Sequence, residues 1–526
     1  MAENTEGPGM LITEILARNA RVYGDEIALV ERTPEVGLRR EISWRTFDSE
    51  ANRFANALMA HGVEKGDRVV QLMMNCLEWL PAYFGILRSG AWVVPLNFRF
   101  EAEVILACSE LADARVLLFG EEFVERITKV KGALDKRVQH YLFIGPDEAC
   151  PTYAQCYTDF IRDAKTTSPA LPLQITDDAA LYFTSGTTGR PKGVRLSHRN
   201  LEHACYVENR HHNQTHDDTF LCIPPLYHTG AKMHWLGHFM VGARGVILRG
   251  VEPKWILQAV SEERATVVWL LVPWALDILA AIDSGEIDIS QYQLSHWRLM
   301  HIGAQPVPPS LITEWKRHFP NQDYDTNYGL TESTGPGCVH LGIENSHKIG
   351  AIGIPGFDWE CRIVDLEGSD LLVGEAGELL VKGPGVMREY YRNPQATREA
   401  LRDGWLHTGD IVRRDSDGFL WLVDRKKDLI ISGGENISPV EIEHFFMAHP
   451  KIQDIAVIGT PDQRLGERVT VIIQVKAGEA LEREEVQHFA EGLPRYKRPR
   501  MIHFDQVPRN ATGKIEKPKL RERYVR

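Results

Sequence analysis

The chain has 526 residues, more than one hydrophobic core usually supports, so we expect two or more globular units with a site between them. Apolar residues make up 43% and charged residues 25%, which is typical of a soluble enzyme and argues against a disordered or fibrous chain. The net charge of −12 gives no general attraction to nucleic acid, so an anionic ligand must be held by local amides, dipoles or a metal.

The cysteines and the N-terminal residues indicate the compartment. The eight cysteines are scattered without a Cys-x-x-Cys pair, so neither a zinc ribbon nor a disulfide framework is indicated and a cytoplasmic location is expected. The N-terminus lacks a basic region followed by an apolar stretch. The longest apolar run, residues 267–282, is interrupted by Pro273 and Asp277, so we expect neither secretion nor a membrane span.

Helices and strands alternate over the first two thirds of the chain. Apolar residues recur at helical spacing over residues 44–61, Gly62 is a typical helix stop, and residues 68–73 form an apolar run typical of a buried strand. Further strands are predicted at residues 92–95, 116–119, 180–183, 267–271 and 299–302. Such alternation predicts mostly parallel sheets covered by helices.

Beyond about Gly350 the pattern changes to short strands separated by turns, which indicates a more antiparallel subdomain. After a charged segment, a helix near residues 440–449, strands at 455–458 and 470–475 and a helix at 482–492 form a new unit. We therefore predict an α/β protein. Its large N-terminal domain (1–424) has helix-covered sheets and a small β-rich subdomain, and a hinge (425–428) joins it to a small mobile α+β domain (429–526).

Residues 210–216 are rich in histidine. A metal site is one interpretation, but a solvated loop is favoured because nothing else in the pattern points to ligand geometry.

The segment 184–193, Thr-Ser-Gly-Thr-Thr-Gly-Arg-Pro-Lys-Gly, carries the strongest chemical pattern. Glycines and hydroxyl residues after a strand let backbone amides and side-chain donors surround a polyphosphate. It is not a Walker A loop, because Pro191 stands where that motif needs glycine and no Ser or Thr follows Lys192. A polyphosphate-binding loop of another kind is predicted.

This loop resembles the phosphate signature of the adenylate-forming superfamily, which includes acyl-CoA synthetases, firefly luciferase and the adenylation domains of peptide synthetases. Four further segments resemble that family in the expected order: residues 328–332, 404–410, 424–428 and 510–515. The resemblance covers nearly the whole chain.

The resemblance implies roles for individual residues. Tyr328 is expected on adenine, Thr331 on the α-phosphate, Glu332 on magnesium, and Asp410 with Arg425 on the ribose. Lys514, with Thr184, Thr331 and Glu332, is expected to be catalytic, because a lysine that bridges carboxylate and α-phosphate stabilises the developing charge. The full nucleotide set implied is Thr184, Ser185, Gly186, Thr187, Thr188, Lys192, Gly303, Ala304, Gln305, Asn327, Tyr328, Gly329, Thr331, Asp410, Arg425 and Lys514.

Further positions are implied for the acyl group and coenzyme A. Lys427 is expected at the hinge, and Gly433 with Gly434 along the pantetheine tunnel. The acyl pocket is expected to involve His228, Lys232, Trp235 and Gln305. Gln305 departs from the family pattern, as does Lys232, which could pair with a polar acyl substituent but is expected to be exposed because a buried unpaired cation is costly.

The resemblance implies an AMP-forming acyl-CoA synthetase that uses ATP, coenzyme A and Mg²⁺. A medium- or long-chain fatty acid is expected first, because Trp235, Trp269, Trp274 and Met233 suggest an apolar acid; an aromatic or alicyclic acid comes second and acetate third. Alternatives are a carrier-protein acceptor, a luciferase-like monooxygenase and a non-catalytic nucleotide-binding scaffold. A homodimer is the base-rate expectation, with no nucleic-acid partner.

Overall fold

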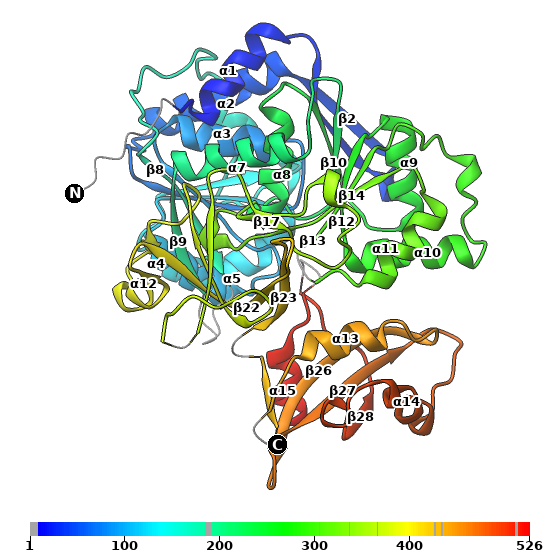
Figure 1. Cartoon of the computed structure of the whole chain (residues 1–526). Helices are drawn as coiled ribbons and strands as arrows, with labels where there is room; N and C mark the ends of the chain where they lie inside the picture. Colours follow the sequence, from blue (N-terminus) through cyan, green and yellow to red (C-terminus); the bar gives the residue numbers. More distant parts are fainter. Residues whose placement is uncertain are drawn as a thin grey trace.

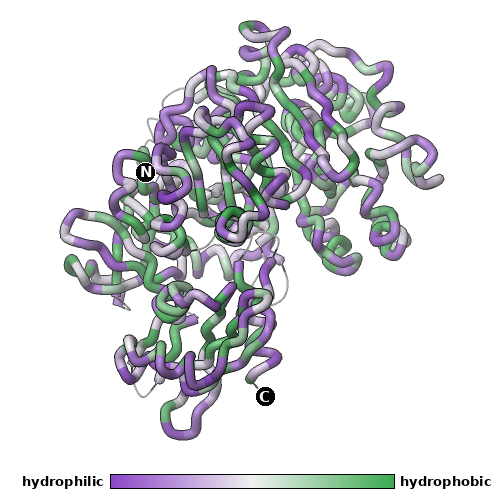
Figure 2. The backbone as a smooth tube through the Cα atoms, turned by 90° about the vertical axis from the view of Figure 1, so that its right-hand side faces the viewer, coloured by the Kyte–Doolittle hydropathy of each residue, from purple (hydrophilic) through white to green (hydrophobic). Residues whose placement is uncertain are grey.

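The computed structural model describes residues 9–184, 191–303, 306–335, 337–365, 367–425, 428–432, 435–510 and 514–525, with the backbone alone at 435 and 436. A large part, coloured blue to yellow in Figure 1, stands above a smaller part made by the last hundred or so residues. The hydrophobic stretches run through the interior of both parts, with hydrophilic loops around them (Figure 2). No helix in the described ranges is both long and apolar enough to cross a bilayer.

Two large sheets organise the first part, and both are mostly parallel. In the eight-stranded sheet only the pairs β8–β9 and β9–β20 are antiparallel. Its strands, in spatial order, are β20 (Glu389–Tyr390), β9 (Lys192–Ser197), β8 (Asp178–Thr184), β4 (Trp92–Pro95), β3 (Arg68–Leu72), β5 (Val116–Gly120), β6 (His140–Ile144) and β7 (Gln155–Cys156).

The second sheet has seven strands, and only its edge pair β1–β2 is antiparallel. Its order is β14 (Asp323–Asp325), β13 (Leu299–Gly303), β12 (Val267–Leu271), β10 (Thr219–Cys222), β11 (Arg244–Leu248), β1 (Ile27–Thr33) and β2 (Leu38–Ser43). Strands buried on both faces need continuous apolar sequences, which is why β12 reads Val-Val-Trp-Leu-Leu.

Helices cover both sheets and fill the space between them. The central layer holds α2 (Trp44–Ala60), α3 (Trp79–Arg88), α7 (His198–His211) and α8 (Thr229–Phe239), whose buried side chains join those of both sheets in one core. The outer helices are α4 (Ala102–Ala112) and α5 (Val124–Leu134) on the first sheet, and α9 (Pro253–Glu263), α10 (Val272–Asp283) and α11 (Pro309–His318) on the second. The remaining helices of this part are α1 (Ile12–Val22), α6 (Tyr157–Ile161) and α12 (Pro394–Ala400).

Two smaller sheets complete the first part. The first contains β15 (Asn327–Tyr328), β16 (Val339–His340) and β17 (Ile354–Pro355). The second contains β18 (Glu360–Val364), β19 (Ala376–Lys382), β21 (Leu401–Arg402), β22 (Trp405–Arg414) and β23 (Leu420–Arg425), all antiparallel. This is the predicted β-rich subdomain.

The small C-terminal part has its own sheet and core. The strands are β24 (Ile430–Ser432), β25 (Glu435–Ile437), β26 (Ile452–Asp462), β27 (Gly466–Val475) and β28 (Met501–Phe504), and the helices are α13 (Pro439–Phe446), α14 (Arg483–Phe489) and α15 (Lys517–Tyr524). Its buried clusters contain only residues from Ile430 onward. The domain limits 1–424, 425–428 and 429–526 nevertheless stay a prediction, and the hinge residue Lys427 lies outside the described residues.

The predicted elements agree with the structure except at their ends. The helix predicted at 44–61 is α2, which begins after Ser43, whose side chain accepts a hydrogen bond from the backbone N–H of Thr46 at 3.2 Å. The strand predicted at 455–458 is only the centre of β26, because the polar ends of β26 lack an apolar pattern yet pair with β27 over ten positions.

A glycine in the turn before β17 fixes the position of β16. Gly353 has φ +115°, and a Cβ there would lie 1.9 Å from the backbone carbonyl of His340. Gly374 also has a positive φ, of +91°, but nothing lies within 4 Å of its Cβ position. Comparing substitutions at the two glycines therefore separates the cost of a strained backbone from the cost of a backbone clash.

We predict that Gly374→Ala lowers stability by about 1 kcal/mol through its backbone conformation alone. Gly353→Ala should lower it several-fold more, because β16 must also move. Thermal unfolding followed by tryptophan fluorescence measures both changes, and equal melting temperatures for the two variants would contradict the clash.

Candidate active site

The end of the predicted phosphate loop lies beside the predicted magnesium ligand. Thr184 ends β8 and pairs with Lys192, the first residue of β9. The Lys192 ammonium lies 4.7 Å from the centre of the Tyr390 ring, and the Tyr390 hydroxyl donates to Glu332 Oε1 at 2.7 Å. Three predicted site residues, from different elements, therefore meet here. Residues 185–188 of the prediction lie outside the described residues.

A hollow of about 270 Å³ adjoins this corner. Lys192, Gly193 and Arg392 contribute to its wall. Because two cationic side chains and backbone atoms surround this hollow, it is suited to bind an anion.

The predicted ribose residues form a connected group. The Tyr328 hydroxyl donates to Asp410 Oδ2 at 2.5 Å, and Arg425 Nε lies 3.2 Å from Asp410 Oδ1. The pairing of β22 with β23 sets Asp410 opposite Arg425. Burial and the neighbouring Asp410 charge raise the pKa of Tyr328 well above its usual value, so the phenol stays a hydrogen-bond donor.

The other predicted nucleotide residues occupy the ends of neighbouring elements. Gly303 ends β13, and its Cβ position would be 4.0 Å from Asn327 Oδ1. Gly329 follows β15, and half-buried Thr331 begins the 3₁₀ turn η5 (Thr331–Ser333). Ala304 and Gln305 lie outside the described residues.

Lys514 belongs to the small part, yet its charge acts on the large part. Its backbone closes a short loop, donating to Asn510 Oδ1 at 3.0 Å, while Arg509 anchors that loop to Asp454 at 2.6 Å. Burial, then the positive charges of Lys514 and Lys232, lower the pKa of His228 to about 3. The charge of the lysine predicted to be catalytic therefore acts at the beginning of α8, where the acyl residues were predicted.

Helix α8 sends its predicted acyl residues in different directions. His228 is the N-cap, and its Nδ1 accepts from the backbone N–H of Gly230 at 3.2 Å. Trp235 is 1% exposed and packs against Phe47 and Phe239 in the central helical layer. The divergence arises because His228 is the extended N-cap residue, whereas Trp235 lies in the helix, about 10 Å further along its axis.

The prediction that Lys232 is exposed was wrong, because its side chain is fully buried. Its ammonium donates to the Tyr182 hydroxyl and lies 4.3 Å and 4.7 Å from the ring centres of Tyr182 and Tyr83. Burial lowers the pKa of Lys232 well below its usual value. Aromatic faces and a phenol oxygen compensate the desolvation that the sequence argument took as prohibitive.

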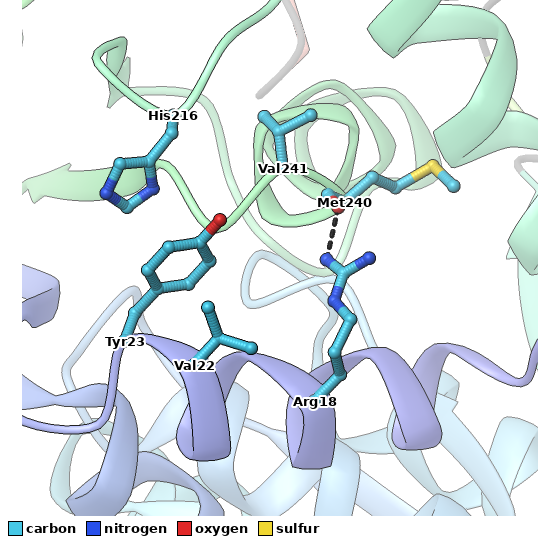
Figure 3. Close-up of a pocket in the computed structure, with 6 residues that line it drawn as sticks. All are labelled: Arg18, Val22, Tyr23, His216, Met240 and Val241. Carbon is cyan, nitrogen blue, oxygen red and sulfur yellow. Dashed lines mark hydrogen bonds between the residues drawn. The ribbon is translucent and has the colours of Figure 1, made fainter.

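The prediction of a solvated histidine loop was wrong at His212. His212 is fully buried at the end of α7 and donates from Nε2 to Asp325 Oδ2 at 2.7 Å. His216, by contrast, stacks on Tyr23 at 4.1 Å beside a hollow of about 430 Å³, in which Arg18 donates to the Met240 carbonyl (Figure 3). That hollow adjoins the end of α8 opposite His228.

His212 is part of a buried group that the sequence did not predict. We call it the histidine–carboxylate cluster: Glu208, His212, His234, His301, Asp325 and His340. All six side chains are at most 2% exposed. They come from α7, α8, β13, β14 and β16, so only the fold brings them together.

His340 joins the two carboxylates of the cluster. Its Nε2 lies 2.9 Å from Glu208 Oε1 and its Nδ1 lies 3.2 Å from Asp325 Oδ2. The amide of Asn327 adds donors to Glu208 Oε1 at 3.1 Å and to His234 Nε2 at 3.0 Å. Asn327, predicted at the nucleotide, thus also connects the cluster to Tyr328.

Burial and charge act in opposite directions in this cluster. Burial alone would raise the pKa of Glu208, but its histidine neighbours, including His340, hold it well below its usual value. Burial alone would lower the pKa of His340, but Glu208 and Asp325 raise it to about 9. At neutral pH the cluster therefore holds two carboxylates and a protonated His340.

Comparison with models of known families decides which family this chain belongs to. Residues 16–391 match the model described as AMP-binding enzyme, and residues 441–514 match the AMP-binding enzyme C-terminal domain.

The chain belongs to the AMP-binding enzyme family.

Relatives of this AMP-binding enzyme are coenzyme A ligases. Crotonobetaine/carnitine–CoA ligase of Citrobacter koseri is 32% identical over 511 residues, which are 95% of this chain and 97% of that protein. Feruloyl-CoA synthase of an Amycolatopsis species is 34% identical over 476 residues, 90% of this chain and 92% of that protein. The predicted superfamily and its acyl-CoA ligase branch are confirmed, and the enzyme is an AMP-forming acid–thiol ligase.

Solved structures confirm the fold of the ligase. The anthranilate CoA ligase AuaEII in complex with anthranoyl-AMP has a TM-score of 0.90 at 28% identity, covering 100% of this chain and 99% of that one. ATP-bound MatB from Rhodopseudomonas palustris has a TM-score of 0.86 at 28% identity, covering 98% and 99%. The predicted two-part α/β class is therefore correct.

The raised pKa of His340 makes a pH-dependent contribution to the stability of the ligase. Because the folded value of about 9 exceeds the unfolded value near 6.5, the contribution is complete below about pH 6.5 and is lost as pH rises through 9. Its size is about 3 kcal/mol.

We predict that His340→Gln lowers the melting temperature strongly at pH 7 and much less at pH 10. Exposed His488 provides the control, since His488→Gln should change little at either pH. Melting curves across this range test the effect, and a His340→Gln deficit that does not vary with pH would contradict it.

Proposed function

We propose that this ligase joins a compact polar carboxylic acid to coenzyme A through an acyl-adenylate. The observation that carries the proposal is the meeting of Lys192, Tyr390 and Glu332 at one corner of the site, together with the Tyr328–Asp410–Arg425 group. Lys514, carried by the small part, is the cation that would meet both a carboxylate beside α8 and the α-phosphate of ATP.

The proposed first step brings two anions together. A carboxylate oxygen attacks the α-phosphorus, forms an O–P bond and breaks the bond to pyrophosphate. Lys514 offsets the charge that develops, Lys192 and Arg392 offer positive charge beside the phosphate loop, and Asp410 with Arg425 orients the ribose.

Magnesium suits the corner at Glu332. That carboxylate is half-buried, accepts one hydrogen bond from Tyr390 and lies on the Lys192 side of the site. Carboxylate oxygen is the donor that Mg²⁺ takes in proteins, and the bound ion would neutralise phosphate charge.

In the proposed second step, coenzyme A approaches the same carbonyl carbon from another side. The thiol of coenzyme A attacks the acyl carbon, AMP leaves, and the thiol proton passes to solvent. We propose that the small part turns about Lys427 to withdraw Lys514, and that Gly433 and Gly434 line the pantetheine path. These three residues lie outside the described residues.

The side chains near α8 favour a polar acid over a fatty acid. Trp235 and Met233 suggested an apolar acid, but both are buried in the packed core. Trp269 stacks on His234 at 4.4 Å, next to the histidine–carboxylate cluster. We therefore place polar aromatic or small polar acids before medium- or long-chain fatty acids, in keeping with relatives named for ferulate, crotonobetaine and anthranilate.

Pyrophosphate release over a panel of carboxylic acids, with ATP and magnesium and with or without coenzyme A, tests the proposal. We expect at least one acid to give multiple turnovers only when coenzyme A is present. Turnover indifferent to coenzyme A would instead indicate a carrier protein or another acceptor, and silence for every acid would favour the non-catalytic scaffold.

Lys514→Ala separates the half-reactions. We predict at least a hundredfold loss of acyl-AMP formation from acid and ATP, because one preorganised charge is worth about that much. Thioester formation from supplied acyl-AMP should be largely spared.

Lys519→Ala is the matched control, since Lys519 is exposed, on α15, and pairs only locally with Glu516. It should leave both half-reactions unchanged. Equal loss of both half-reactions in Lys514→Ala would contradict the role assigned to Lys514.

A further inference from the structure

The histidine–carboxylate cluster buries two carboxylates, Glu208 and Asp325. The His340 ring lies 2.9 Å from Glu208 and 3.2 Å from Asp325, and the His212 ring lies 3.6 Å and 2.7 Å from the same two groups. Burial lowers the pKa of both His234 and His301, so these rings are neutral at physiological pH. A buried carboxylate oxygen without a partner is costly unless a positive group or a donor completes it.

One carboxylate oxygen of the cluster faces an acceptor. His234 Nδ1 lies 2.6 Å from the Gly230 carbonyl, so that nitrogen carries the proton and Nε2 presents a lone pair. Asn327 donates to this Nε2, and Glu208 Oε2 lies 3.5 Å from it. Two lone pairs thus oppose each other in the protein interior.

Polar atoms here lack hydrogen-bond partners within the described part of the chain. They are Glu208 Oε2, His340 Nδ1, both ring nitrogens of His301 and Trp269 Nε1. Glu208 and His301 are fully buried, and native proteins rarely leave such groups unsatisfied. Glu208 Oε2 therefore lacks a hydrogen-bond donor, and a positive group beside this oxygen would be favourable.

Aromatic faces border the same place. The His234 ring stacks on Trp269 at 4.4 Å and lies 4.2 Å from His301. The Trp269 and His301 rings therefore pack closely around His234, beside Glu208.

The cluster lies at a suitable distance from the reacting end of the acid. His228 and His234 are six residues apart on α8, about 9 Å along the axis. In the proposed reaction the carboxylate of the acid lies beside Lys514, at the His228 end of α8. A substituent a few bonds away would reach His234 and Glu208.

We propose that the acid carries a positively charged nitrogen, which pairs with the buried, unpartnered Oε2 of Glu208. This inference rests on the proposed ligase function and narrows its substrate class to cationic carboxylic acids.

Hydrogen bonding explains the cluster better than a metal ion does. His212, Asp325 and His340 have donor atoms close enough for a metal site. However, His212 Nε2 and Asp325 Oδ2 are 2.7 Å apart, whereas two ligands of one tetrahedral zinc are about 3.3 Å apart. The short separation is that of a donor and an acceptor.

Matched acids test the proposal, because a quaternary ammonium and a tert-butyl group have nearly the same shape. Trimethylammonio-acetate, -propanoate and -butanoate are compared with 3,3-dimethylbutanoate, 4,4-dimethylpentanoate and 5,5-dimethylhexanoate, by kcat/KM for pyrophosphate release with coenzyme A. We expect one cationic member to exceed its neutral partner at least about tenfold. A neutral partner that is equal or better in every pair would overturn the inference while leaving the ligase function intact.

Glu208→Gln should abolish this preference, keeping the shape but not the charge. Glu202→Gln is the matched control, six residues earlier on α7, and should keep it. Should Glu208→Gln fail to fold, Asp325→Asn takes its place. A preference unchanged in the variant that folds would overturn the proposal, as would zinc at one ion per chain in the purified protein.

Thermal shift with AMP present gives a readout that needs no turnover. Stabilisation by a cationic acid and not by its neutral partner supports the inference even if pyrophosphate release is absent. No shift with any cationic acid overturns it. Failure of the proposed ligase function is seen separately, as the absence of pyrophosphate release with every acid of the larger panel.

Discussion

The structure depends on bringing two anions together in a protein whose own net charge is −12. A carboxylate and a triphosphate repel each other, and no general positive field exists here to overcome that repulsion. The solution is local: Lys192 beside the phosphate loop, Arg425 on Asp410, and Lys514 from the small part facing α8. Each is positioned by a different element, so the site exists only when the two parts are together.

The division into two parts therefore has a chemical reason. Lys514 sits on a short loop anchored by Arg509 and Asp454, so the small part carries it as one unit. Strand β23 ends at Arg425, the first residue of the predicted hinge, and Asp424 accepts hydrogen bonds from Ser438 and from the backbone of Val440 at the start of α13. The ribose contact and the contact to the small part thus come from adjacent residues of one strand.

Helix α8 has a polar side and a side packed in the hydrophobic core. His234 turns toward Glu208 and His301, while Trp235, the next residue, turns into the helical core. A single step along a helix rotates the side chain by about 100°, so neighbouring residues serve different surroundings. For this reason the segment that was predicted to line the acyl pocket contains side chains with unrelated roles.

The sequence predicted the fold class, most central strands and the family, because these depend on local apolar patterns and short contiguous motifs. It did not predict the histidine–carboxylate cluster, because Glu208, Asp325 and His340 are far apart in the chain and each looks ordinary alone. It misjudged Lys232, because its aromatic partners, Tyr83 and Tyr182, come from other elements. The His-rich stretch was a usable signal, but its split between buried His212 and surface His216 depends on where α7 ends.

The central claim is that the carboxylate of the acid attacks the α-phosphorus of ATP. Supplying an acid with both carboxylate oxygens labelled with ¹⁸O, together with ATP and coenzyme A, and measuring the mass of the products tests it directly. The account predicts one labelled oxygen in AMP and none in pyrophosphate, since the oxygen that forms the O–P bond leaves with AMP. Unlabelled AMP, or label in inorganic phosphate, would contradict it.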